Sequence, residues 1–216
     1  MRYLFCVLLM MAFSHTSFCQ DVPADSLLLE LDKTTPEEPE SLLPEKMLLT
    51  QRMLWGEHGL YRKVGIAPKV LTAETRQKEL KIRRTMFRIH QAIGLATAAG
   101  MIAQGYLGSK IYNPETYTTK LKSWHEGMAT GINIGYATTA LMSFTAPPKA
   151  VYRKKFDNIK LHRILSYVHL SGMITTNVLA HRIDNNFQVN KKLHRNVALT
   201  TFGAYALAIA TIKFEF

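Results

Sequence analysis

The sequence predicts an all-α fold, an integral membrane bundle of four helices that follows an N-terminal leader and a mostly disordered or amphipathic soluble segment. Two observations predict this fold. First, four stretches after residue 85 lack Asp, Glu, Lys and Arg for roughly 16 to 20 residues each, about the length at which a helix crosses the hydrocarbon core of a bilayer. Second, each stretch opens with a histidine, in the sequences R-I-H-Q, S-W-H-E and, twice, K-L-H-R.

The first residues have the pattern of a secretory signal peptide over 1–19. Arg2 precedes an apolar run that ends at Phe13 and is too short to span a membrane, and small or polar residues follow. A lipoprotein processing site at Cys19 is the alternative, but residues 16–18 match its small-residue context poorly. Both cysteines of the chain lie in this leader, so we expect no disulfide and no C-x-x-C metal or redox site in the mature protein.

The next two segments differ sharply in charge. Residues 20–45 carry eight acidic side chains against Lys33, together with four prolines, which predicts a flexible acidic arm. Residues 46–85 are basic and begin with an amphipathic stretch around Trp55, which we interpret as a surface helix at the lipid headgroups. Glycines and Pro68 then predict turns, and a strongly basic helix leads into the bundle, residues 86–216.

Local breaks separate the predicted spans. Asn113 and Pro114 lie in the first connection and break the helix there, Pro147 and Pro148 end the second span, and the third connection contains the Asp-Asn-Asn sequence 184–186. Glycines at close-packing spacings predict that the helix backbones approach one another, and next to a flat cofactor they would also leave room for its face. The spans run over about 88–107, 124–144, 161–180 and 193–212.

The histidines predict metal ligation. Consecutive membrane helices start on opposite faces, so His90 and His162 share one depth, and His125 and His194 share the other. An ionisable side chain at membrane depth is costly and is usually kept where it meets a partner inside the bundle. Because neutral imidazole is the commonest nitrogen ligand for a metal, each pair is suited to hold a haem iron from both sides.

One alternative ligand and two candidate haem contacts accompany these pairs. His169 lies seven residues after His162, on the same face and roughly 10 Å further along the axis, so only one of the two matches the depth of His90. We place His162 first and keep His169 as the other ligand or as a buried hydrogen-bond donor. Arg163 and Arg195 each follow a predicted ligand and either bind the haem carboxylates or only mark the membrane interface.

This arrangement resembles the cytochrome b561 family, on the histidines His90, His125, His162 and His194 and on the stretch L-H-R-I-L-S-Y-V-H-L-S-G-M. The resemblance covers roughly the last 130 residues. It implies two b-type haems, each held by a histidine pair, and electron transfer across a membrane. The chain lacks the flanking helices of typical members and any donor-binding motif, so the electron donor, the acceptor and a redox partner protein stay unassigned.

The charge of the chain indicates its surroundings. The net charge is +11, but the basic residues cluster at the ends of the spans, where they favour binding to anionic lipid headgroups over binding to nucleic acid. We expect a bacterial inner membrane location. The leader favours an exported N-terminus, whereas the basic flank before the first span and the basic loop 149–160 favour the opposite orientation, so the orientation is left open.

The sequence therefore predicts a membrane cytochrome that carries electrons, either as a transmembrane oxidoreductase or as an electron-transfer subunit. The alternative is a non-catalytic membrane subunit or scaffold whose histidines only form hydrogen bonds between helices. A proton relay is disfavoured because the spans lack buried acids. A hydrolase is disfavoured because no nucleophile stands in a recognisable catalytic setting.

Overall fold

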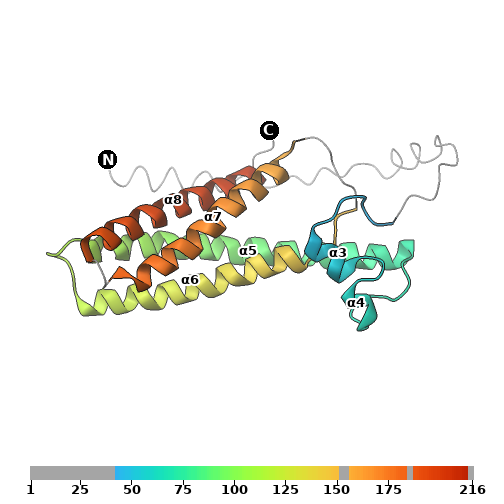
Figure 1. Ribbon diagram of the computed structural model, residues 1–216, viewed down its shortest axis with the longest axis horizontal. Helices are drawn as coiled ribbons and strands as arrows, with labels where there is room; N and C mark the ends of the chain where they lie inside the picture. The colour runs from blue at the N-terminus through green and yellow to red at the C-terminus, as the bar shows by residue number, and fades with distance from the viewer. Residues whose placement is uncertain (1–41, 151–155, 184–186, 214–216) are drawn as a thin grey trace. The chain divides into compact units, whose positions relative to one another are not determined.

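The computed structural model describes residues 42–150, 156–183 and 187–213, and within these ranges every regular element is an α-helix. This confirms the all-α prediction. The leader and nearly all of the acidic segment lie outside the described residues, as does the 184–186 break. The helices are α3 (Leu49–Trp55), α4 (Leu60–Lys63), α5 (Ala73–Tyr112), α6 (Thr119–Thr145), α7 (Asn158–His181) and α8 (Phe187–Lys213) (Figure 1).

Side-chain caps begin three of the long helices. The Thr72 hydroxyl accepts the backbone N–H of Thr75 at the start of α5, and the Thr75 hydroxyl accepts that of Thr72 in return. Thr118 caps α6 and Asp157 caps α7 in the same way. The helices α5 and α6 end at Tyr112 and Thr145, just before the predicted Asn-Pro and Pro-Pro breaks.

Helix α5 is much longer than the first predicted span. It has 40 residues and runs without interruption through residue 85, where we had predicted the border between the juxtamembrane segment and the bundle. The basic lead-in and the first span therefore form one helix. The reason is local, because the sequence between Ala73 and Arg88 contains no glycine or proline that would end a helix.

The four long helices form two antiparallel hairpins. Helix α5 packs along α6 and α7 packs along α8, while α5 meets α8 over a shorter length (Figure 1). A side chain at Gly135 would place its Cβ 2.6 Å from the hydroxyl of Thr97, and one at Gly172 would collide with Thr201. These two glycines therefore allow close approach within the hairpins, whereas Gly131 faces open space.

Polar and aromatic side chains connect the hairpins. Among the described residues no Cα atom of α6 lies within 8 Å of one in α7, so contact between these two helices is made by side chains. Asn133 and Asn177 exchange two hydrogen bonds of 2.7 and 3.1 Å between these helices. Tyr205 donates a hydrogen bond of 3.0 Å to the carbonyl of Gly94. The hairpins are therefore held together through side chains and leave more space between their backbones than exists within each hairpin.

The burial pattern of the long helices is unusual. Threonines and a histidine are among their most buried residues, namely Thr97, Thr139, His169, Thr201 and Thr211. Large apolar side chains lie on the outside instead, with exposed fractions between 47% and 64% for Leu95, Ile102, Ile134, Leu141, Ile174, Leu199 and Leu207.

No helix in the described part of the chain reaches both the length and the mean hydropathy expected of a membrane span.

Residues 42–72, which we call the cap, form a packed structure before α5. For this region the sequence predicts a short amphipathic helix around Trp55 followed by turns; α3 lies at that position, and its packing against α6 is not predicted. The cap is attached to α5 by a buried ion-pair cluster. Glu79 of α5 is fully buried and forms ion pairs with Arg62 of the cap at 2.6 Å and with Arg76 of α5 at 2.9 Å. Arg62 lies 17 residues before Glu79 and belongs to a different helix, so no helical spacing in the sequence indicates that the two side chains meet.

The cap and the start of α5 bind the end of α6. The last carbonyls of a helix have no donor within the helix and need partners from elsewhere. Here Trp55 donates to the carbonyl of Thr145 at 2.7 Å, and Arg83 donates to that of Pro147 at 2.6 Å. Arg76 donates to the carbonyl of Pro148 at 2.8 Å. Burial, and after it the charge of Arg76, lower the pKa of Arg83.

Candidate metal centres

Each long helix carries one of the four predicted ligands, and all four side chains are half-buried. His90 of α5 and His162 of α7 lie near one level of the bundle, because Tyr205 bonds the carbonyl of Gly94, one turn from His90, and His162 bonds the carbonyl of Ala208, one turn from Tyr205. The pairing of His125 of α6 with His194 of α8 stays a prediction.

Three of the four rings hold a backbone carbonyl of the neighbouring helix in their hairpin. The contacts run from Nδ1 of His90 to Thr139 at 3.0 Å, from Nδ1 of His162 to Ala208 at 2.8 Å and from Nδ1 of His194 to Thr176 at 3.0 Å. A carbonyl oxygen can only accept, so Nδ1 carries the hydrogen in each ring. In the neutral ring the proton is then absent from Nε2, whose lone pair is free to bind a metal.

This arrangement is the usual one for a metal-binding histidine. A ligating imidazole commonly donates its second ring N–H to a carbonyl or carboxylate, which sets the tautomer and the orientation of the ring. The sequence could not identify the acceptors, since Thr139 and Ala208 lie 49 and 46 residues from their histidines and offer only backbone atoms.

His125 differs from the other three. Its Nδ1 is buried and has no hydrogen-bond partner among the described residues. The ring lies against Gly108 of α5, where a Cβ would stand 3.2 Å from the His125 Cε1, and Gln104 donates to the carbonyl of His125 at 3.0 Å. Buried polar atoms nearly always have partners, so an unpaired imidazole nitrogen at this position is compatible with an ion or group that binds there.

His169 lies in an aromatic cluster in the middle of the bundle. Its Nδ1 is 2.5 Å from the hydroxyl of Tyr136, and its ring centre is 5.0 Å from that of Tyr205. On α7 it stands seven residues from His162 and seven from Thr176, so it is midway between the levels of the two histidine pairs, about 10 Å from each. It remains the second candidate on this helix.

The two candidate arginines lie in different surroundings. The guanidinium of Arg195 stacks over the ring of Tyr112 at 4.6 Å, next to Lys191, which lies 4.8 Å from the same ring. A cation over an aromatic face is attracted to it, so Arg195 is held at the end of α5. Arg163 is exposed near the start of α7. The structure does not bring these two arginines together.

The donor set fits haem. In the described ranges no group of three or more His, Cys, Asp or Glu side chains gathers in a metal-binding cluster, whereas a haem iron needs only two axial ligands from the protein. His90, His162 and His194 carry their hydrogen on Nδ1, which leaves Nε2 able to bind iron. At the fourth position, His125, the buried Nδ1 has no hydrogen-bond partner among the described residues.

No protein family, curated protein or solved structure matches this chain.

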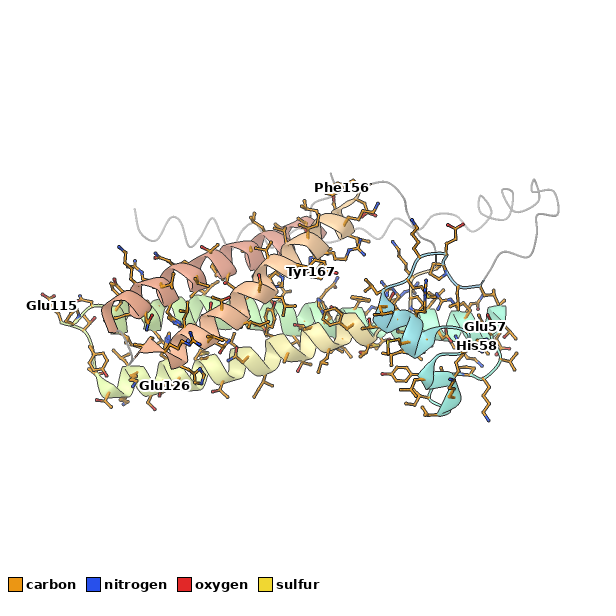
Figure 2. The ribbon with its side chains drawn as sticks, viewed as in Figure 1. Glu57, His58, Glu115, Glu126, Phe156 and Tyr167 are labelled. Carbon is orange, nitrogen blue, oxygen red and sulfur yellow. The ribbon has the colours of Figure 1, made fainter. Side chains whose placement is uncertain are left out.

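The hydrogen bond between Tyr136 and His169 gives a first prediction. Tyr136→Phe leaves a buried ring nitrogen without a partner, and we expect it to lower the free energy of unfolding by about 1–3 kcal/mol. Tyr167→Phe on the exposed side of α7 (labelled in Figure 2) is the control and should change it by less than about 0.5 kcal/mol. Denaturant unfolding of the purified protein measures both, and equal losses would contradict a specific role for the Tyr136 hydroxyl.

Proposed function

We propose that this protein is a membrane b-type cytochrome that passes electrons across the bilayer through two haems. His90 and His162 would hold one haem, and His125 and His194 would hold the other. The observation that carries the proposal is the orientation of the histidines. In three of them Nδ1 is bonded to a carbonyl, which leaves Nε2 available, and each proposed pair would take one histidine from each hairpin.

The protein's own residues would then have distinct tasks. A bound b-type haem supplies a centre that accepts and releases one electron. The carbonyls of Thr139, Ala208 and Thr176 keep three ligand rings in one tautomer and one orientation. Tyr136, His169 and Tyr205 fill the space between the two levels and keep water out of it. Arg163 and Arg195 remain candidates for binding the haem carboxylates.

The distribution of side chains supports a bilayer location, for which we propose the bacterial inner membrane. Large contiguous apolar surfaces are rare on proteins that face water. In a lipid environment small and hydroxyl-bearing residues commonly pack between helices, as Gly135 does against Thr97 and Gly172 against Thr201. Lys and Arg residues flank the apolar runs, where anionic headgroups would bind them. The electron donor, the acceptor and any redox partner protein are not assigned.

A non-catalytic membrane subunit or scaffold is the second candidate. The observation that favours it is that the three histidine–carbonyl bonds themselves join neighbouring helices and would stabilise the bundle without any cofactor.

An absorption spectrum separates these candidates. We expect the protein, purified in detergent from cells well supplied with haem, to show b-type bands that sharpen on reduction with dithionite, at about two haems per chain. A colourless preparation would contradict the cytochrome proposal and leave the scaffold. His181→Ala, at an exposed histidine that binds the carbonyl of Asn177 in its own helix, is the matched control and should keep both haems.

A further inference from the structure

One part of the cap directs apolar side chains outward. It consists of α4 and the turn that follows, Leu60–Val70, which we call the anchor loop. Lys63 and Lys69 are exposed within it. Contiguous exposed apolar side chains are typical of surfaces that bind a protein or a membrane. The exposed fractions are 51% for Leu60, 59% for Val64, 65% for Ile66 and 69% for Val70.

The anchor loop is held in one conformation from its inner side. Gly65 adopts a φ of 82°, which glycine reaches without strain, and the N–H of Ala67 donates to the carbonyl of Tyr61 at 2.8 Å. The buried side chain of Arg62 donates to backbone carbonyls on both sides of the loop. Its acceptors are Gly56 at 3.0 Å, Trp55 at 3.1 Å and Pro68 at 2.8 Å. The outward apolar residues therefore need no ordering when they bind a surface.

The position of the cap suggests what that surface is. Trp55 and Arg83 tie the cap and the start of α5 to the carbonyls at the end of α6, where Pro147 and Pro148 close the helix. In a bilayer-spanning bundle this end of α6 lies at the level of the lipid headgroups. The cap is thereby held where its outward side chains can reach lipid.

We infer that the anchor loop inserts into the headgroup layer of an anionic bilayer. The inference rests on the membrane location in the proposed function. Apolar side chains at the surface of a bilayer enter the boundary between headgroups and acyl chains, and lysines beside them bind anionic lipid. Leu60, Val64, Ile66 and Val70 would supply the first interaction, and Lys63 and Lys69 would supply the second.

Site-specific fluorescence tests the inference on the full chain. With Cys6→Ser and Cys19→Ser as background, an NBD fluorophore is attached to a cysteine introduced by Ile66→Cys or, as a control in the polar turn before α4, by His58→Cys (Figure 2). In bilayers of phosphatidylcholine and phosphatidylglycerol we expect the label at Ile66 to shift its emission to the blue and to be quenched by doxyl-labelled lipid. The label at His58 should show neither effect.

The lysines provide a second variant that leaves the apolar residues unchanged. Lys63→Gln with Lys69→Gln should weaken the preference of the labelled loop for phosphatidylglycerol over pure phosphatidylcholine, since each basic residue near an anionic surface strengthens binding about fivefold. A label at Ile66 that emits as in water in both bilayers would overturn the inference. A second result would also overturn it: the label at Ile66 is protected from water, is not quenched by lipid, and becomes exposed to water when residues 20–40 are deleted. In that case the acidic segment, and not lipid, would cover the loop.

The same samples separate this inference from the proposed function. The reduced absorption spectrum reports haem, and the NBD emission reports the loop. A colourless sample with a quenched label would reject the cytochrome and support the anchor loop. A sample with both haems and an unquenched label would reject the anchor loop alone.

Discussion

His162→Ala is expected to remove one haem and to leave the other. In the proposed function, the change would remove one of the two histidines that hold one haem, and His125 and His194 would still hold the other. We therefore expect about half of the reduced b-type absorbance to remain, with His90→Ala giving the same result. Haem extracted per chain, measured against protein by amino-acid analysis, is the readout.

The variant at His169 decides which histidine of α7 binds iron. His169→Ala should keep both haems and lower stability, because it removes the partner of the Tyr136 hydroxyl from the centre of the bundle. If His162→Ala retains both haems while His169→Ala loses one, the assignment of the ligand on α7 is wrong. The pairs also predict that His125→Ala and His194→Ala lose the opposite haem, with His90 and His162 still bound to theirs.

Glu79→Gln is expected to have the largest effect on stability. The carboxylate is fully buried and is the acidic partner of both Arg62 and Arg76. Removing it leaves two buried guanidinium groups without a counter-charge, and breaking a buried pair in this way costs about 3–5 kcal/mol. We expect the cap to detach from the end of α6 before the long helices unfold.

Trp55 reports this change directly, because its indole N–H is bonded to the carbonyl of Thr145. In a Trp124→Phe background, which removes the other tryptophan of the chain, Glu79→Gln should shift the Trp55 emission to the red at a lower denaturant concentration than in the parent. Glu74→Gln removes the exposed pair with Lys78 and is the matched control, for which we expect no measurable change. Similar unfolding curves for the two variants would show that the buried cluster does not hold the cap.

The sequence predicted the bundle helices because their signals are local. Apolar runs free of charge, the Asn-Pro pair at Asn113 and the Pro-Pro pair at Pro147 are features of neighbouring residues, and the helices end where these features lie. The basic helix predicted before the first span and the span itself are one helix, α5, because nothing in the backbone chemistry between them ends a helix.

The tertiary structure alone decided how the parts meet. Each imidazole of His90 and His162 is oriented by a carbonyl more than 40 residues away, and a carbonyl is present at every position, so no residue type identifies it. The Glu79 cluster and the ordered cap depend equally on distant partners. The sequence by itself determined where the helices and the four histidines stand along the chain. Which histidines face each other, which ring nitrogen is free and what closes the end of α6 depend on contacts between distant segments, which exist only after the hairpins have packed.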